Sequence, residues 1–293
     1  MAPAELTYNF LINPKSGKGS KHDTAKVIVD FFNQHRHTHQ IFYTEYPGHA
    51  RELANKLTAK NQVVVAVGGD GTIHEIADGL KGSQGCLGLL PAGSGNGLAR
   101  HLGVSMDLKI ALEQLISSRI VQMDLLTING KLSINIGGIG FDGFIAKEFT
   151  NQTSRGLSGY VRLIVQNFFS YREFEYDLEL DEQSISGKAF SIAFCNGSQY
   201  GNQARIASEA SVTDGLMDIV VIRKPRLFQI PKLVFQVMRG KLNSGEFVQL
   251  YKGQDVNVRL KQSIDLQLDG EFAGTVEMFG VQVIPKALNI LRP

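Results

Sequence analysis

Residues 63–72 read Val-Val-Val-Ala-Val-Gly-Gly-Asp-Gly-Thr, and this stretch decides the fold. The apolar run Val63–Val67 has no polar alternation, which is typical of a strand covered on both faces of a sheet. The glycines after it let the backbone turn sharply and bring N–H groups close to a ligand. Apolar residues at helical spacing follow from Ile73 to Leu80. The stretch therefore predicts a strand, a glycine turn and a helix N-terminus, which together make an anion site.

Asp70 lies inside this predicted anion site. A carboxylate would repel a phosphate group, so a bridging Mg²⁺ is the economical explanation for its position. The alternative is a plain glycine turn in which Asp70 caps the helix. The rest of the chain has to decide between these two interpretations.

Two more glycine-rich loops follow predicted strands. The first, Asn13–Ser20, is basic and follows the strand Tyr8–Ile12. The second, Pro91–Arg100, follows the apolar strand Leu87–Leu90. Its Ser94 and Asn96 offer short polar side chains to a phosphate or a ribose. Three glycine loops at strand ends within one hundred residues favour a phosphate site over three unrelated turns.

Strands and helices alternate through the first part of the chain, which predicts a doubly wound parallel sheet. Ligands of such sheets bind at the carboxyl ends of the strands, where Asn13, Thr44 and Gly68 are expected. After about residue 128 the pattern changes to strands separated by turns, which is typical of a β-sandwich. We expect an α/β domain over 1–127, a β-sandwich over 128–284, and a tail, about 285–293, that returns to the first domain.

Composition narrows the class of protein. The chain has 293 residues and is 43% hydrophobic and 20% charged. Its net charge of only +2 is too small to imply a strong electrostatic attraction for nucleic acid. Cys86 and Cys195 lie in apolar runs, as reduced core cysteines of a cytoplasmic protein do. The start lacks a signal-peptide pattern, and no apolar run approaches the roughly 20 residues that span a bilayer. We expect a cytoplasmic protein with peripheral contact to the inner membrane face, either monomer or homodimer.

Three motifs together carry a resemblance. Gly-Gly-Asp-Gly-Thr at 68–72, Asn-Pro-Lys-Ser-Gly at 13–17 and the loop 91–100 resemble the diacylglycerol kinase catalytic-domain family in order and spacing. That family includes bacterial lipid kinases and the sphingosine and ceramide kinases. The resemblance implies a Rossmann-like nucleotide-binding domain, a C-terminal β-sandwich, and transfer of phosphate from ATP to a lipid hydroxyl with Mg²⁺. An enzyme similar to NAD kinases, which share a version of the motif at 68–72, is the alternative; it would phosphorylate a soluble nucleotide.

The resemblance also implies roles for single residues. Asp70 and Asp124 would organise the catalytic Mg²⁺, and Glu271 would be the general base. From the residues alone, Asp269-Gly270-Glu271 reads as a hairpin turn between strands. A second, structural Mg²⁺ would take the carbonyls of Ser211 and Leu216 and the carboxylate of Asp214. The nucleotide site would use Asn13, Thr44, Gly68, Gly69, Asp70, Gly71, Thr72, Glu75, Gly93, Ser94 and Asn96.

The third loop departs from the bacterial pattern. Gly97 stands where bacterial members usually have an aspartate, and Gly-Ser-Gly-Asn-Gly-Leu-Ala at 93–99 is closer to the sphingosine kinase version. Both a diacylglycerol-like and a sphingoid acceptor therefore stay open. Gly138–Gly143 also matches G-x-G-x-x-G, but Arg162 stands where a dinucleotide site needs a carboxylate.

Two helices are predicted in the second domain. The first, Leu157–Tyr171, is expected to face the core, with a lipid-facing surface as the alternative. The second, Arg226–Arg239, is rich in apolar residues.

Overall fold

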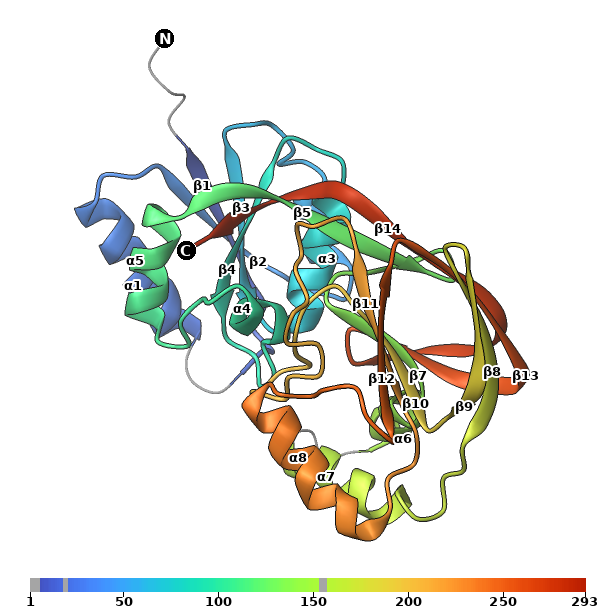
Figure 1. The fold of residues 1–293 in the computed structure, drawn as a ribbon. Helices are drawn as coiled ribbons and strands as arrows, with labels where there is room; N and C mark the ends of the chain where they lie inside the picture. The colour runs from blue at the N-terminus through green and yellow to red at the C-terminus, as the bar shows by residue number, and fades with distance from the viewer. Residues whose placement is uncertain (1–5, 18–20, 153–156) are drawn as a thin grey trace. The chain divides into compact units, whose positions relative to one another are not determined.

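The computed structural model describes residues 6–17, 21–152 and 157–293, which form two compact units (Figure 1). Unit 1 consists of residues up to Met123 together with Lys286–Pro293, and unit 2 consists of Asp124–Pro285. The chain passes from one unit to the other within strand β5 (Arg119–Ile128) and again within β14 (Glu271–Arg292). Residues 18–20 of the first glycine loop lie outside the described part of the chain.

Unit 1 is a parallel sheet in the order β2-β1-β3-β4-β14. All five apolar residues of Val63–Val67 are buried, because β3 lies inside this sheet with partners on both sides. The tail at Asn289–Ile290 pairs with β4 and extends the sheet. The elements of unit 1 are β1 (Thr7–Ile12), α1 (Lys21–Gln34), β2 (His39–Tyr43), α2 (His49–Ala54), β3 (Gln62–Gly68), α3 (Asp70–Leu80), β4 (Cys86–Pro91), α4 (Gly97–His101) and α5 (Leu108–Ser117).

The strand order places the candidate loops. The strand order reverses between the neighbouring strands β1 and β3: β2 follows β1 on one side of the sheet, and β4 follows β3 on the other. In open parallel sheets a ligand crevice forms at such a point, outside the carboxyl ends of the strands. The loops that start at Asn13 and Gly69 follow these two strands.

Unit 2 is a β-sandwich whose strands pair antiparallel in the order β12-β11-β10-β7-β13-β14, with β8 on β13 and β9 on β8. Its inward-facing residues form one large apolar cluster that includes Phe174, Phe194 and Phe279. The predicted fold class, α/β followed by a β-sandwich, is confirmed. The remaining elements are β6 (Lys131–Ser133), β7 (Ile136–Gly140), α6 (Phe141–Thr150), α7 (Leu157–Asn167), β8 (Phe174–Leu180), β9 (Gln183–Ala189), β10 (Ser191–Cys195), β11 (Met217–Ile222), η1 (Leu227–Gln229), α8 (Ile230–Arg239), β12 (Val248–Gly253) and β13 (Asp255–Leu268).

The alternating run Leu132–Ile136 does not form one continuous strand, because β6 ends at Ser133 and β7 begins at Ile136. The backbone N–H groups of Ile134, Asn135 and Ile136 instead point to the carboxylate of Asp269. A long-range side-chain acceptor therefore replaces ladder pairing at this break.

The two predicted helices of unit 2 are α7 and α8, the second preceded by the short helix η1. In α7, Leu163 is buried against an aromatic cluster, whereas Val161 and Val165 are exposed. The helix thus has both a core face and an apolar outer edge. Across residues 6–17, 21–152 and 157–293, no helix combines the length and apolar character that a transmembrane span requires.

Candidate functional site

The N-terminus of α3 follows β3 directly through a glycine. Its N-cap, Gly69, has extended backbone (φ −97°, ψ −172°) and contributes no side-chain cap. Side chains normally satisfy some of the first N–H groups of a helix, and anions bind where they do not. Residues 68–72 thus place the backbone N–H groups of a helix start at the end of a strand, as the predicted anion site requires. Anion binding there stays a prediction.

Asp70 connects the second glycine loop to the third. Its two carboxylate oxygens accept hydrogen bonds from the backbone N–H groups of Asn96, at 2.9 Å, and Gly97, at 2.8 Å. Hydrogen bonds to an ionised acceptor are stronger than neutral ones, so this contact fixes the two loops relative to each other.

The same two loops touch through their glycines. A Cβ atom on Gly93 would lie 2.5 Å from Cα of Gly69, which is too close unless the backbone of one loop moves. Asn96 holds the third loop in shape: its Oδ1 accepts from the N–H of Gly93 at 3.0 Å, and its Nδ2 donates to the Gly93 carbonyl at 2.9 Å. Asn96 is buried and left-handed (φ 52°), so its side chain shapes this loop, whereas Ser94 is exposed.

Replacing Gly93 with alanine should separate the two loops. We expect the free energy of unfolding to fall by about 1–3 kcal/mol, because the new methyl group overlaps the Gly69 backbone. Affinity for Mg·ATP should fall with it, measured by titration calorimetry. Gly245→Ala is the control, because nothing lies within 4 Å of a Cβ at that position and it should change neither quantity. Wild-type stability and affinity in Gly93→Ala would contradict the close approach of the loops.

The first loop joins the others through Asn13. Its Nδ2 donates to Thr72 Oγ1 at 3.2 Å, which links the end of β1 to the start of α3. Thr44 is buried, and its N–H donates to the Ile12 carbonyl at 2.9 Å. The Glu75 carboxylate accepts from the N–H groups of Gly48 and Ala50, at 2.9 and 3.1 Å. Glu75 therefore holds the N-terminus of α2 to α3.

Asp124 of unit 2 lies against the loop that precedes β11. Its N–H donates to the Val212 carbonyl at 2.7 Å, and its Oδ2 accepts from the N–H of Gly215, also at 2.7 Å. Its own carbonyl accepts from Asn196 Nδ2 at 2.8 Å. Among the described residues, three buried amide oxygens of this region accept no hydrogen bond: Asn135 Oδ1, Asn196 Oδ1 and Gln199 Oε1. Carboxylate and amide oxygens are ligands that Mg²⁺ accepts, so Asp124 and Asn196 fit a hard cation.

The predicted structural Mg²⁺ loop holds a lysine instead. Lys252 Nζ lies 2.8 Å from Asp214 Oδ2 and 3.6 Å from Asp218 Oδ2. Hydrogen bonding to Asp214 raises the pKa of Lys252, so the ammonium stays charged beside the pair. A positive group already neutralises Asp214, which does not suit a second cation there. Nowhere in residues 6–17, 21–152 and 157–293 does a group of three or more His, Cys, Asp or Glu side chains lie together in a way that could hold a metal ion.

Glu271 follows a tight hairpin turn. Leu268 pairs with Glu271, and the two residues between them, Asp269 and Gly270, are both left-handed (φ 51° and 91°). This matches a type I′ turn, so the hairpin prediction is confirmed. The Glu271 side chain is exposed at the start of β14.

Asp269 anchors that turn. Its carboxylate accepts four hydrogen bonds of 2.8 to 3.2 Å, from Ser133 Oγ and from the N–H groups of residues 134–136. Gln267 adds a second support, because its Oε1 accepts from the N–H of Gly270 at 2.8 Å. The turn before Glu271 is thus fixed from two sides.

The carboxyl group of Asp142, a half-buried residue, lies next to Gln267. Asp142 Oδ2 accepts from Gln267 Nε2 at 3.2 Å and from the Tyr200 hydroxyl at 2.9 Å, and Oδ1 accepts from Ser191 Oγ at 2.9 Å. Burial raises the pKa of Asp142, and the three donors oppose that rise. A Cβ on Gly138 would lie 2.2 Å from Asp142 Oδ2, so the glycine pattern at 138–143 makes room for this carboxyl.

Two sequence profiles of known domains match the chain, one over its first part and one over its second part. The sequence profile described as "Diacylglycerol kinase catalytic domain" matches residues 7–128. The profile described as "YegS C-terminal NAD kinase beta sandwich-like domain" matches residues 137–292, more than half of the chain. The chain belongs to the diacylglycerol kinase catalytic-domain family. The resemblance expected from the three glycine motifs is therefore confirmed.

Individual members of this family are distant from the chain. A diacylglycerol kinase of Bacillus subtilis (strain 168) is 25% identical over 271 residues, which cover 90% of this chain and 89% of the relative. A crystal structure of a diacylglycerol kinase from Bacillus anthracis superposes with a TM-score of 0.75 at 18% identity and covers 99% of this chain and 97% of that one. At 18% sequence identity, this structural similarity supports the fold alone.

The family motifs did not reveal the anchoring residues of unit 2. Asp269 contacts Ile134, and Asp142 contacts Gln267, in each case across more than 120 residues of sequence. The sequence gives no signal for this, because Gln267 occupies a polar position of the alternation Ile264-Leu266-Leu268 and would be expected to face outward, yet it is buried. A buried amide in such a place has to find partners.

Replacing Asp269 with alanine tests this anchor. Three backbone N–H groups would lose their acceptor, so we expect the free energy of unfolding to fall by about 3 kcal/mol or more. Asp181→Ala is the control. Asp181 is also a left-handed hairpin residue (φ 49°), but the two N–H groups it accepts from are exposed, and we expect a loss below about 1 kcal/mol. Equal losses in urea unfolding would show that the Asp269 contacts contribute little.

Proposed function

We propose that this chain is an ATP-dependent lipid kinase that transfers the γ-phosphate of ATP to a hydroxyl group of a diacylglycerol-like or sphingoid lipid. The observation that carries the proposal is the convergence of three glycine loops in unit 1. Asn13 joins the first loop to α3, and Asp70 joins α3 to the third loop. Their N–H groups and the N-terminus of α3 provide positive partial charge for a triphosphate.

We assign the nucleotide to unit 1. Phosphoryl transfer depends mainly on positioning and on neutralising charge, which these amides supply. Bound Mg²⁺ would neutralise further phosphate charge, and the carboxylates of Asp70 and Asp124 are the groups we assign to it. Asn13, Thr44 and Glu75 keep the loops in position around the nucleotide. The buried Asn96 side chain acts on its own loop.

We assign the acceptor proton to Glu271. A carboxylate on a rigid turn can accept the proton of an attacking hydroxyl group, and Asp269 and Gln267 keep this turn rigid. The lipid acceptor resides in a membrane, so the protein is expected to work as a peripheral enzyme at the inner membrane face.

Transfer of label from γ-labelled ATP identifies the acceptor class. Diacylglycerol, monoacylglycerol, sphingosine and phosphatidylglycerol in mixed micelles are compared with NAD in the same buffer. The proposal predicts label in the organic extract from one of the lipids and none in NAD. Label in NAD alone would favour the NAD kinase-like alternative, and label in no acceptor would contradict both.

A further inference from the structure

Helix α8 presents more apolar surface than the body of unit 2 covers. None of its ten residues, all of them described, is buried. Leu233 and Val237 face inward and pack against the cluster that contains Ile206 and Val220. The remaining apolar residues of the helix face outward, although burial would be the usual state of such side chains.

These outward residues form one continuous face. At the helical spacing of 100° per residue, Val234, Met238 and Phe235 lie on one arc, next to Leu227 and Phe228 of η1. All five are exposed, from 49% for Met238 to 73% for Phe228. We call these five residues the α8 apolar face. A set of large exposed apolar residues this close together marks an interaction surface.

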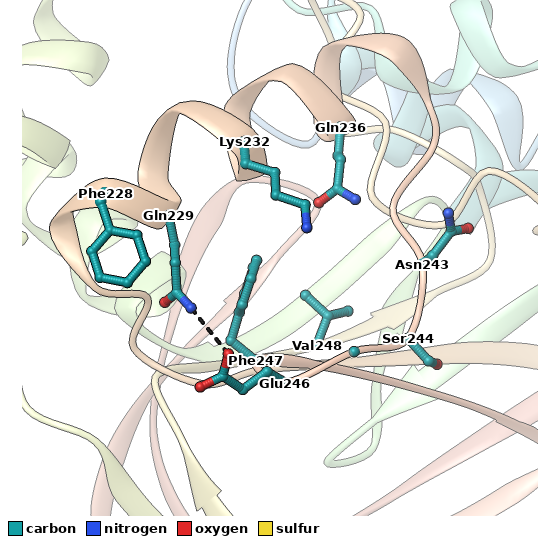
Figure 2. Close-up of a pocket in the computed structure, with 10 residues that line it drawn as sticks. Phe228, Gln229, Lys232, Gln236, Asn243, Ser244, Glu246, Phe247 and Val248 are labelled. Carbon is teal, nitrogen blue, oxygen red and sulfur yellow. Dashed lines mark hydrogen bonds between the residues drawn. The ribbon is translucent and has the colours of Figure 1, made fainter.

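Within the segment that carries this face the charges are of one sign, whereas Glu173 and Glu246 contact the segment from neighbouring parts of the chain. The segment 223–243 contains six Lys or Arg residues and no Asp or Glu, in a chain whose net charge is only +2. Arg239 lies over the Phe235 ring, with its Cζ 5.0 Å from the centroid. On the polar side of α8, Lys232 and Gln236 extend over a groove of about 440 Å³ that separates the helix from Phe247 and Val248 (Figure 2).

The α7 segment also exposes apolar side chains, and it is hydrogen-bonded to the chain just before η1. Lys224 Nζ donates to the carbonyl groups of Phe169 and Tyr171, at 2.9 and 2.6 Å, just before the chain enters η1. Phe169 is 62% exposed, as is Val165 one turn earlier. The end of the α7 segment and the start of η1 are therefore held together by one lysine.

We propose that the α8 apolar face docks the protein onto a membrane surface that carries anionic lipids. An amphipathic helix with a basic flank lies in the membrane interface, with its apolar side chains in the acyl boundary and its cations near the head groups. Both parts are present here, and the excess of Lys and Arg selects an anionic surface. The inference rests on the proposed function in one respect: an enzyme that phosphorylates a lipid has to reach the membrane in which that lipid lies.

Vesicle sedimentation of the full chain tests the docking. Wild-type protein should bind vesicles that contain about 30% phosphatidylglycerol in phosphatidylcholine, because this lipid makes their surface anionic. It should bind vesicles of pure phosphatidylcholine much more weakly. The double variant Phe228→Ser/Phe235→Ser should lower the partition coefficient about tenfold or more. Arg226→Glu/Arg239→Glu should remove most of the dependence on phosphatidylglycerol. Met278→Ser is the matched control, because Met278 is 73% exposed like Phe228 but lies on β14.

Three results of the vesicle experiment would overturn the proposal. They are absence of wild-type binding to the anionic vesicles, equal binding by the Phe228→Ser/Phe235→Ser variant, and an equal loss in Met278→Ser. A wild-type dimer in sedimentation velocity that becomes a monomer in the double variant would also overturn it, because a second copy would then cover the face.

Failure of docking and failure of the kinase proposal are distinguishable. With a short-chain form of the lipid that accepts label in the transfer assay, dispersed as monomers, the double variant should be as active as wild type if the chain is a lipid kinase. Vesicle binding without any turnover would contradict the kinase proposal alone. Turnover without vesicle binding would contradict the docking alone.

Discussion

Glu271→Gln should lower the rate of phosphoryl transfer by about 10²- to 10⁴-fold, the contribution that a positioned general base usually makes. The amide cannot accept the hydroxyl proton, whereas it keeps the size and hydrogen-bonding shape of the carboxylate. Glu271 is exposed, so the free energy of unfolding should stay within about 0.5 kcal/mol of wild type. The rate is measured in a single turnover with excess enzyme and labelled ATP.

The control for this variant lies on the same strand. Glu277 is exposed on β14 as well, and Glu277→Gln should leave the rate unchanged. Affinity for Mg·ATP should be the same in both variants, because the nucleotide is assigned to unit 1. A near-wild-type rate in Glu271→Gln would remove Glu271 from the chemistry, and weakened ATP binding would assign it to the nucleotide site instead.

Asp70→Asn should act on both ATP binding and turnover. The carboxylate accepts from two N–H groups, of Asn96 and Gly97, and the amide has one acceptor oxygen in their place. One N–H would face a donor, and the third loop would move away from α3. We expect kcat/KM to fall by about 10²-fold or more, and the free energy of unfolding to fall by about 1–3 kcal/mol.

Asp78→Asn separates this effect from a general loss of charge in α3. Asp78 is on the same helix and, within the described part of the chain, pairs with two surface groups, Arg51 at 3.4 Å and Lys81 at 3.6 Å. Surface pairs of this kind contribute little, so we expect a change below about 1 kcal/mol and wild-type kinetics. Equal effects of the two variants would refute the loop-joining role of Asp70.

The features that could be predicted from the sequence are those that local residue patterns determine. Strand β3, its glycine turn and the helix after it follow from ten consecutive residues, and the alternation of strands and helices then determines the parallel sheet. The hairpin before Glu271 was also predictable, because Asp-Gly supports two left-handed residues in a row.

Long-range partners were not predictable from local pattern. Glu75 reaches the N–H groups of Gly48 and Ala50 across the gap between two helices, and Lys252 reaches Asp214 from the neighbouring strand. In each case the partner is set by how elements pack, which a single sequence does not display. The break at residues 134–135 has the same origin, since its acceptor, Asp269, comes more than 130 residues later.

Hydrogen exchange of backbone amides, measured with and without Mg·ATP, tests the central claim most directly. The claim is that N–H groups at the strand ends of unit 1 hold the triphosphate. It predicts that Mg·ATP slows exchange in peptides that contain residues 68–73 and 92–97, and that Asp70→Asn abolishes this protection. Protection confined to the other glycine pattern, at 138–143, or no protection in residues 68–73 and 92–97 at saturating Mg·ATP would contradict it.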